Sequence, residues 1–226
     1  MTDLVHVAFI MDGNSTWAKK NNKAIMDGYL EGMRTMTNVI PLAKNLGLKY
    51  VTFYAFSSEN WGRPKKWLFN FMKLITKFLN GNDMITKALE ANARVNVIGD
   101  LSKLSAEFQN ILKEYVAKTI DNQGMTIQLA INYGGRDEIV RAARKVSKLG
   151  LEFTEENISD NLDTGGIPDP ELIIRTSGKQ RISNFLLWQA SYSEFYFSDV
   201  LWPDFGELEL QNAINEFLSR KRTYGK

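Results

Sequence analysis

The stretch VHVAFIMDGNSTW, residues 5–17, joins an apolar run to a turn that is rich in polar groups. Residues 5–11 form a short, mainly apolar run, which predicts a buried strand. Residues 12–17 bring together a carboxylate, a glycine and small polar side chains, a combination typical of a turn. In open α/β sheets, binding sites form beyond the carboxyl ends of the strands. Asp12, which directly follows the strand, is therefore a candidate functional residue.

Short apolar runs alternate with longer helical patterns along the rest of the chain. Further strands are predicted over residues 49–56, 94–98, 126–132, 172–175 and 195–197. Helices are predicted over about residues 28–45 with a kink at Pro41, after Pro64, and over residues 105–118, 136–149 and 207–222. This alternation predicts an α/β fold with a mainly parallel sheet covered by helices. No linker or repeat interrupts it, so we expect one domain over residues 1–226.

The composition excludes several classes of protein. The 226 residues are 44% hydrophobic and 24% charged, which is typical of a globular chain with a buried core. A net charge of +2 argues against bulk nucleic-acid binding. No apolar run reaches ~18 residues, so no membrane span is predicted. The first residues do not form a secretory signal pattern, and the expected location is the cytoplasm.

The residue types also limit the chemistry. The absence of cysteine excludes disulfides, thiolate nucleophiles and cysteine–zinc sites. His6 is the single histidine, so a histidine-rich metal site is excluded and a Ser-His-Asp triad would have to use it. Because His6 opens the first strand, we favour a structural hydrogen-bonding role for it. The common phosphate-loop, dinucleotide, hydrolase and zinc-protease motifs are absent, as is the DDxxD pair of all-helical prenyl synthases.

Three polar turns each follow a predicted strand. In Asp12-Gly13-Asn14, free backbone amides could hold a phosphate and the carboxylate could bind Mg²⁺; the alternative is a helix N-cap. Residues 57–64 present hydroxyls, an amide, a carboxylate and a guanidinium, or else only cap the next helix. Residues 175–184 contain three cations and two serines. Arginine suits phosphate oxygens, and the alternative is a solvated loop.

Two further features leave alternatives open. In the helical pattern of residues 67–79, the polar residues form one narrow stripe of Asn70, Lys73, Lys77 and then Asn80. This segment is therefore either a core helix or the wall of a lipid-binding space. Glu194 stands beside an aromatic strand. It is either a strand-end residue or a second acidic group for a metal ion or a buried arginine.

Taken together, these segments resemble the cis-prenyltransferase family, which includes bacterial undecaprenyl diphosphate synthases. The segments that carry the resemblance span nearly the whole chain in order: residues 6–14, 54–61, 132–136, 175–178, 181–189, 194–197 and 202–205. The resemblance implies a central, mainly parallel six-stranded sheet, flanking helices, an apolar substrate tunnel and a homodimer. It also implies a Mg²⁺-dependent enzyme that extends an allylic diphosphate, usually farnesyl diphosphate, with isopentenyl diphosphate units.

The implied product is a polyprenyl diphosphate such as undecaprenyl diphosphate, the lipid-carrier precursor for cell-wall synthesis. The product would give the enzyme a peripheral association with the membrane. The resemblance implies that Asp12 binds Mg²⁺ and that Glu194 is the second metal-binding residue, organised across the dimer interface. Ser57 and Asn60 assist condensation and proton removal. Ala55 is the position at which a bulky residue shortens the product.

The resemblance also assigns the two diphosphate sites. The backbone amides of Gly13 and Asn14, with Arg63, would hold the allylic diphosphate. The isopentenyl diphosphate site would comprise Arg175, Arg181 and Ser183. The remaining substrate-binding residues that it implies are Ser15, Thr16, Trp17, Tyr29, Ser58, Glu59 and Trp61.

Three basic residues of the family's allylic site are replaced in this chain. Thr16 stands where the family has arginine, Ile25 at a second arginine position, and Tyr29 where the family has histidine. A charge-assisted hydrogen bond contributes ~1.5–3 kcal/mol, so these losses predict weaker allylic binding. Two alternatives stay open. One is a relative that joins two short allylic diphosphates irregularly; the other is a non-catalytic partner subunit that binds polyprenyl diphosphate.

Overall fold

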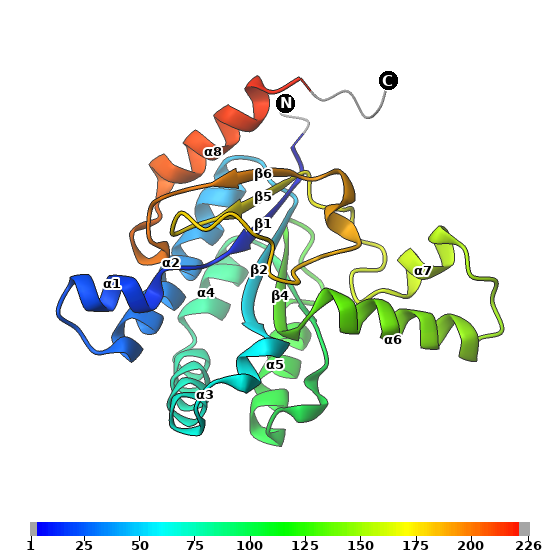
Figure 1. Cartoon of the computed structure of the whole chain (residues 1–226), viewed down its shortest axis with the longest axis horizontal. Helices are drawn as coiled ribbons and strands as arrows, with labels where there is room; N and C mark the ends of the chain where they lie inside the picture. The colour runs from blue at the N-terminus through cyan, green and yellow to red at the C-terminus, as the bar shows by residue number, and fades with distance from the viewer. Residues whose placement is uncertain (1–3, 222–226) are drawn as a thin grey trace.

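The computed structural model describes residues 4–221 and contains one six-stranded sheet (Figure 1). Its strand order is β3-β4-β2-β1-β5-β6, and every neighbouring pair is parallel. The strands are β1 (His6–Ile10), β2 (Tyr50–Ser57), β3 (Arg94–Ile98), β4 (Thr126–Tyr133), β5 (Leu172–Arg175) and β6 (Glu194–Phe197). The expected six-stranded sheet is confirmed, and it is parallel throughout.

Eight helices connect the strands or follow them within the described residues. They are α1 (Asn14–Lys20), α2 (Ile25–Asn45), α3 (Lys65–Asn80), α4 (Asp83–Glu90), α5 (Ala106–Thr119), α6 (Gly135–Lys148), α7 (Glu155–Asn161) and α8 (Glu207–Ser219). Four short 3₁₀ helices are η1 (Ser58–Gly62), η2 (Leu101–Lys103), η3 (Gln189–Tyr192) and η4 (Trp202–Asp204). No helix among residues 4–221 combines the length and apolar character needed to cross a bilayer.

The two faces of the sheet are packed differently. Successive residues of a strand point to opposite faces, so Val7 and Phe9 join the larger core while Ala8 and Ile10 join the smaller one. The larger core also contains buried residues from α2, α3, α4, α5 and α8. Phe185 and Leu186, from the segment after β5, fill the smaller core. The larger core therefore gives one side of the sheet a deep layer of helices.

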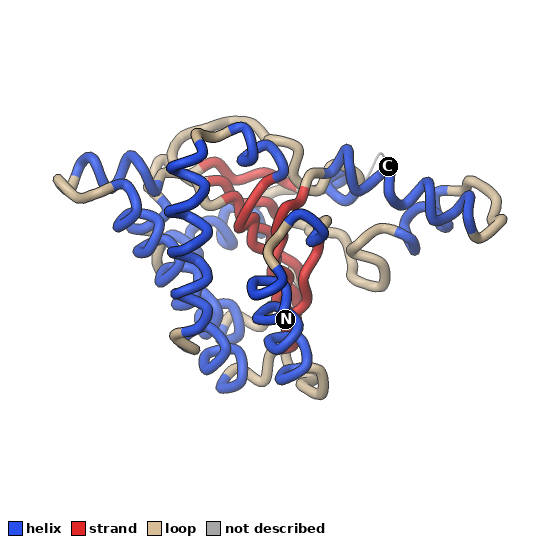
Figure 2. The backbone as a smooth tube through the Cα atoms, turned by 90° about the horizontal axis from the view of Figure 1, so that it is seen from below, coloured by secondary structure: helices blue, strands red, loops and turns tan. Residues whose placement is uncertain are grey.

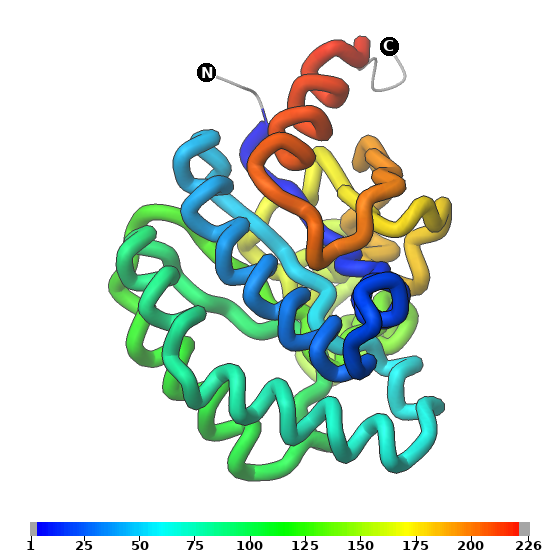
Figure 3. The backbone as a smooth tube through the Cα atoms, turned by 90° about the vertical axis from the view of Figure 1, so that its left-hand side faces the viewer, coloured from blue at the N-terminus to red at the C-terminus, as the bar shows by residue number. Residues whose placement is uncertain are grey.

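The arrangement of the helices places a wall beside the sheet. Helices α2 and α3 run past each other in front of the sheet (Figure 3). Helices α6 and α7 pack on each other and extend to one side as an arm (Figures 1 and 2). Any space between the sheet and the α2–α3 layer must therefore be lined by side chains of the larger core.

Several predicted boundaries are wrong by a few residues. Residues 12–17 were expected to form a turn, but α1 begins at Asn14 because Gly13, at φ +111°, reverses the chain three residues after β1 ends. Helix α8 ends at Ser219, where Arg220 becomes extended and its side chain pairs with Glu194 and Glu216. Residue 222, the predicted end, lies outside the described residues. Helix α7 was not predicted.

Candidate active site

The carboxyl ends of β1 and β5 meet at the point where the strand order reverses. From β1 the chain builds the sheet toward β2, β3 and β4, and β5 then adds on the opposite side of β1. In such sheets this switch point is the usual position of a ligand site. Ile10 pairs with Arg175 in the register, which brings Arg175 beside the turn that follows β1.

Asp12 and Arg175 form an ion pair at this switch point. The Oδ2 atom of Asp12 accepts a hydrogen bond from Nη2 of Arg175 at 2.9 Å. The Asp12 side chain is 38% exposed, whereas that of Arg175 is only 4% exposed. The acid therefore faces solvent while the guanidinium is held in the protein, so the two sequence-predicted residues occupy one site.

Thr176 holds the backbone of Asp12 in place. Its buried hydroxyl donates to the Asp12 carbonyl at 2.6 Å and accepts from the Asp12 amide at 3.0 Å. The Asp12 Oδ1 atom accepts from the Gly13 amide at 2.9 Å. A Cβ atom at Gly13 would lie 3.0–3.2 Å from Leu201, in a left-handed conformation that favours glycine. Sequence reasoning gave Thr176 no role, although it directly follows Arg175.

The loop after β5 presents Arg181 and Ser183 beside Arg175. Nη1 of Arg175 donates to the Ser183 hydroxyl at 2.8 Å and to the Arg181 carbonyl. The Arg181 and Ser183 side chains are exposed. Ser183 has φ +52°, a conformation that non-glycine residues rarely adopt and that often occurs at functional sites. The three predicted residues of the isopentenyl site are thus together.

The end of β2 carries a bulge and the second polar turn. Tyr54 pairs with Ala130 and Phe56 with Ile131, so Ala55 is the extra residue of β2. Bulges of this kind redirect side chains near active sites. Two residues beyond Ala55, the Ser57 amide donates to Oδ1 of Asn60 at 3.0 Å. This bond closes the turn that contains both predicted catalytic residues.

A cavity of about 350 Å³ joins these loops to the layer of helices. Its polar lining comes from the turn after β1, the start of α1, the last residues of β2 and β5, and the turn after β2: Asp12, Gly13, Asn14, Ser15, Thr16, Ser57, Asn60, Arg63 and Arg175. Its apolar lining comes from the sheet and from α2, α3 and α4: Met33, Met36, Ala55, Trp67, Phe71, Ile75, Phe78, Leu79, Met84, Leu129 and Ile131. One space therefore combines an end suited to charge with an end suited to hydrocarbon.

Two buried polar atoms of this lining have no hydrogen-bond partner. They are Nε of Arg175 and Oδ1 of Asn14. Unpaired buried donors and acceptors are rare in proteins and are commonly satisfied by a ligand or water. A ligand with anionic oxygens would satisfy the arginine.

Two of the three replaced basic positions, Thr16 and Tyr29, line the cavity on its α1–α2 side. The Ser15 hydroxyl donates to the Tyr29 hydroxyl at 3.2 Å, and the Tyr29 ring packs edge-on against Trp67 and Phe71. Thr16 lines the cavity and Ile25 is 40% exposed. Tyr29 therefore contributes apolar wall where the family has a histidine.

The neighbouring cations do not replace the lost charges in this structure. Lys19, Lys20 and Lys23 are exposed and do not line the cavity; Lys23 lies over the Trp17 ring at 4.8 Å. Arg63 lines the cavity and lies 5.1 Å from the Trp67 ring. Among the described residues, Arg63 and Arg175 are therefore the cationic side chains that line the cavity.

Asn184 joins three loops at the rim of the site. Its Nδ2 donates to Oε1 of Glu59 at 2.6 Å, and its Oδ1 accepts from the Arg136 amide at 3.0 Å. Its carbonyl accepts from the Gly135 amide at 2.7 Å. Burial alone would raise the pKa of Glu59, but hydrogen bonds from Asn184 and Ser58 outweigh burial and hold that pKa below its usual value. Glu59 therefore anchors the loop as a carboxylate.

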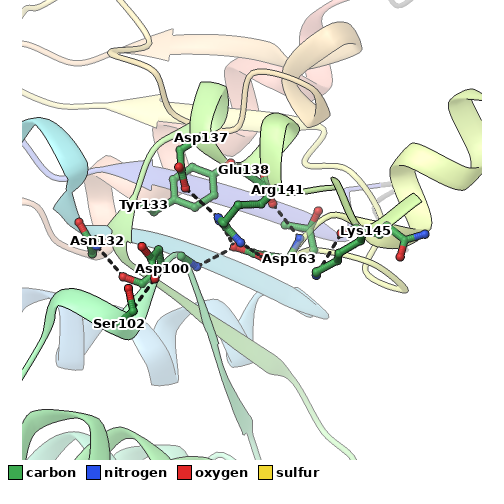
Figure 4. Close-up of polar contacts among 12 residues, drawn as sticks. Asp100, Ser102, Asn132, Tyr133, Asp137, Glu138, Arg141, Lys145 and Asp163 are labelled. Atoms are coloured by element: carbon green, nitrogen blue, oxygen red, sulfur yellow. Dashed lines mark hydrogen bonds and ion pairs between the residues drawn. The ribbon is translucent and has the colours of Figure 1, made fainter. Parts of the chain in front are cut away.

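A polar network supports the loops after β3 and β4 (Figure 4). Arg141 donates to both carboxylate oxygens of Asp163 at 2.6 Å, and Asp163 accepts from the Gly99 amide at 2.9 Å. Burial raises the pKa of Glu138, which accepts from the Tyr133 hydroxyl at 2.5 Å. These bonds fix the end of β4 to α6 and to the loop that follows α7.

Trp61 and Trp17 have anchoring contacts. Trp61 donates to Asn132 at 2.7 Å and so ties the turn after β2 to the end of β4. Trp17 is buried and donates to Asp204 at 2.6 Å.

Six of the predicted substrate-binding residues do not line the cavity: Trp17, Trp61, Ser58, Glu59, Arg181 and Ser183. The other predicted substrate-binding residues line it, as do Asp12, Ser57 and Asn60.

Glu194 lies at the opposite edge of the sheet. It begins β6 and pairs in register with Leu172, three residues before Arg175 on β5. Three residues of a strand span roughly 10 Å. Its carboxylate accepts from Nη1 of Arg220 at 2.8 Å. The structure therefore does not bring Glu194 to Asp12 within one chain.

The donor set around Asp12 fits one kind of metal site. Residues 4–221 contain no group of three or more acidic or histidine side chains that could hold a metal ion. Mg²⁺ accepts one or two protein carboxylates when substrate phosphates and waters complete its coordination. The exposed Asp12 carboxylate at the cavity mouth fits that arrangement.

Sequence comparison decides the family. Residues 10–225 match the family described as putative undecaprenyl diphosphate synthase. The chain belongs to this family of cis-prenyltransferases. A relative from Micrococcus luteus, named ditrans,polycis-undecaprenyl-diphosphate synthase, (2E,6E)-farnesyl-diphosphate specific, is 43% identical and covers 97% of this chain and 90% of its own length.

Two solved structures share this cis-prenyltransferase fold. Lavandulyl diphosphate synthase from Lavandula x intermedia, in complex with dimethylallyl diphosphate, has a TM-score of 0.93 at 34% identity and covers 99% of this chain and 98% of its own. A probable undecaprenyl diphosphate synthase from Campylobacter jejuni has a TM-score of 0.84 at 36% identity, covering 100% of both chains. The resemblance drawn from the sequence motifs is confirmed.

Proposed function

We propose that this protein extends an allylic diphosphate with isopentenyl diphosphate and releases a polyprenyl diphosphate; the name of its Micrococcus luteus relative, an undecaprenyl-diphosphate synthase specific for farnesyl diphosphate, supports the proposal. The single observation that carries the proposal is the cavity with Asp12 and Arg175 at one end and an apolar lining at the other. A prenyl diphosphate has the same two parts, a charged head and a hydrocarbon tail. We propose farnesyl diphosphate as the allylic substrate and undecaprenyl diphosphate, a lipid-carrier precursor for cell-wall synthesis, as the product.

The reaction requires charge to be stabilised on a leaving diphosphate. The allylic C–O bond breaks, both of its electrons leave with diphosphate, and the isopentenyl double bond forms the new C–C bond. In our proposal, Asp12 holds Mg²⁺ at the cavity mouth, which when bound neutralises charge on the diphosphate. In our proposal the Asn14 amide and Arg63 orient the allylic diphosphate, and the Gly13 amide, which donates to Asp12 at 2.9 Å, would join them by exchanging that acceptor for a phosphate oxygen. The first helical amides of α1 have no acceptor within the helix, which suits this role.

The isopentenyl diphosphate is held on the β5 side of the site. In our proposal Arg175, Arg181 and Ser183 bind its phosphates, because arginine provides paired donors that match phosphate oxygens. The buried position of Arg175 keeps its guanidinium in a fixed orientation. Ser57 and Asn60 line the same cavity. In our proposal they assist loss of the proton that restores a double bond in the added unit.

The growing chain occupies the apolar part of the cavity. Ala55 lines it at the bulge of β2, where a small side chain leaves space. Tyr29, Met33 and Met36 recur along α2 at helical spacing and face the same space. We propose that this cavity serves as the substrate tunnel expected from the sequence, and that its extent limits the chain length of the product.

We propose a homodimer for the assembly and the cytoplasm for the location. Glu194 pairs with Arg220 at the far edge of the sheet, so a role for Glu194 in metal binding requires a second copy of the chain. Sedimentation equilibrium measures the assembly. A Glu194→Gln variant that remains dimeric but loses Mg²⁺-dependent turnover supports the shared arrangement, whereas unchanged turnover removes Glu194 from the site.

The experiment compares two substrate sets with the purified protein and Mg²⁺. Farnesyl diphosphate with labelled isopentenyl diphosphate reports elongation, and dimethylallyl diphosphate alone reports irregular coupling. We expect label in chains longer than the farnesyl group and no product from dimethylallyl diphosphate alone. A branched product from the second reaction alone would overturn the elongation proposal.

Irregular coupling is the second candidate function. The similarity to lavandulyl diphosphate synthase and Tyr29 at a family histidine position favour it. Asn14 and Asn60, which match the elongating pattern, are both at the cavity and argue against it. A non-catalytic partner subunit is a weaker candidate, because such relatives usually lose the metal-binding aspartate and Asp12 is present at the cavity mouth.

A further inference from the structure

Helix α3 separates the cavity from solvent and has apolar groups on both sides. Trp67, Phe71 and Ile75 line the cavity on its inner face. On its outer face Phe69 is 68% exposed and borders a surface groove with Leu68 and Met72. The helix is therefore a single layer between the hydrocarbon part of the cavity and the outside.

The outer face of α3 is strongly basic. Lys65, Lys66, Lys73 and Lys77 are all exposed, and residues 60–82 contain no aspartate or glutamate. Lys65 and Lys66 stand in the first turn, where the helix dipole disfavours positive charge. Intrinsic helix stability therefore does not account for this charge pattern.

Two other strongly exposed apolar side chains, Phe153 and Leu208, lie beside acidic helices, whereas Leu149, 63% exposed, directly follows Lys148 at the end of α6. Phe153 is 63% exposed beside α7, which carries Glu155, Glu156 and Asp160 and no basic residue. Leu208 is 65% exposed on α8, which likewise contains three acids and no basic residue. Helices α3 and α8 lie at opposite ends of the molecule (Figure 1). Helix α3 thus contains four lysines and no acid, whereas the charged residues of α7 and α8 are all acidic within their bounds, and Arg220 and Lys221 follow α8 directly.

We infer that the outer face of α3 docks on the surface of an anionic bilayer. Basic helices with an aromatic or aliphatic patch bind in the plane of such surfaces, and each lysine near the surface contributes about 1 kcal/mol, or about fivefold in binding. Glu107 borders the same groove as Lys73 and Lys77, so one carboxylate beside the four exposed lysines leaves the outer face of α3 net positive.

This inference deepens the proposed function and rests on it for its purpose. A polyprenyl chain in the cavity would lie one helix away from the bilayer that dissolves it. The binding itself needs no substrate, so its test is independent of turnover.

Flotation with lipid vesicles tests the inference. One set of vesicles contains phosphatidylcholine alone, and the other contains equal parts of phosphatidylcholine and phosphatidylglycerol. We expect the protein to float with the second set only, and less so as salt is raised, because salt screens surface charges. Lys73→Gln combined with Lys77→Gln should lower binding about 25-fold, and Phe69→Ser should lower it as well.

Matched control variants lie elsewhere on the surface. Arg144→Gln with Lys148→Gln removes two exposed charges from α6, and Phe153→Ser removes an exposed phenylalanine. Both should bind as the wild type does. Circular dichroism and turnover in detergent establish that the α3 variants remain folded. The inference is overturned if the wild type does not float with anionic vesicles, or if control and α3 variants lose binding equally.

Discussion

The Asp12 carboxylate accepts a hydrogen bond from Arg175 at 2.9 Å, which joins the turn after β1 to the end of β5. This contact links the residue that we propose binds the metal ion to the residue that we propose binds isopentenyl diphosphate. Asp12 is accessible and Arg175 is buried. A substitution at Asp12 therefore changes the charge at the cavity mouth and also removes the ion-pair partner of the buried Arg175.

Asp12→Asn tests the role of the carboxylate while keeping an oxygen for the Gly13 amide. We expect turnover to fall roughly 10²-fold or more, because stabilisation of the leaving diphosphate is lost. Initial rates over a range of Mg²⁺ concentrations measure the effect. Asp160→Asn, an exposed change on α7, is the control. Near-normal turnover of Asp12→Asn in excess Mg²⁺ would remove Asp12 from the mechanism.

Arg181→Ala tests the isopentenyl site with little structural disturbance. The Arg181 side chain is exposed, and its contact to Arg175 uses the backbone carbonyl, which the variant keeps. Loss of one charge-assisted phosphate contact should raise the KM for isopentenyl diphosphate roughly 10- to 100-fold with a smaller change in kcat. Lys179→Ala is a matched control in the same loop. A change confined to the KM of the allylic substrate would move Arg181 to the other site.

Thr16→Arg combined with Tyr29→His restores two cationic positions of the family. Arg63 is the cation that lines the allylic side, and Lys19, Lys20 and Lys23 do not line the cavity. The variant should therefore bind farnesyl diphosphate roughly tenfold more tightly, the effect of about one good charge-assisted bond. Isothermal titration measures both proteins. Equal affinities would show that existing groups already compensate for the missing charge.

His6 predicts acid sensitivity of the fold. The carbonyl of Pro168 can only accept, so Nδ1 of His6 carries the proton at 2.6 Å and Nε2 accepts from the Thr52 hydroxyl at 2.8 Å. Burial lowers the pKa of His6 from 6.5 to about 4, outweighing the bond to Pro168. The unfolded chain therefore binds more protons between these pH values. The contribution of neutral His6 to the stability of the folded protein is present above pH 6.5 and is lost as the pH falls toward 4.

Urea unfolding of the wild type and His6→Gln at several pH values measures this contribution. Between pH 6.5 and about 4, the wild type should lose up to ~1.4 kcal/mol per pH unit more than the variant, which cannot titrate at this position. Parallel pH profiles for the two proteins would show that His6 is not the responsible group.

The strands and the chemistry-bearing turns could be predicted because both depend on local sequence. The run before Asp12 and the run before Arg175 are apolar, and each predicted strand edge is within two residues of the observed one. Contacts between distant segments could not be predicted in the same way. The Thr176 hydroxyl reaches Asp12 across 164 residues, and Asn184 reaches Glu59 across 125. Only the paired register of β1 and β5 brings the first of these together.

The start of α1 and the position of Glu194 also depend on features that the local residue pattern does not indicate. A glycine with positive φ allowed α1 to begin earlier than the polar composition of residues 12–17 indicates. An acidic residue beside an aromatic strand fits either end of a sheet, and only the register of β5 with β6 places Glu194 at the amino end. The spacing of Tyr29, Met33 and Met36 was a usable signal for the cavity wall.

The most direct test of the account is the chain length of the products made by the wild type and by Ala55→Leu. Both proteins are incubated with Mg²⁺, farnesyl diphosphate and labelled isopentenyl diphosphate, and the products are separated by length. Because Ala55 lines the apolar part of the cavity, we expect the wild type to extend the farnesyl chain by several units and the variant to release shorter chains at a comparable initial rate. No extension by the wild type, or identical product lengths from both proteins, would contradict the claim that this cavity holds the growing prenyl chain.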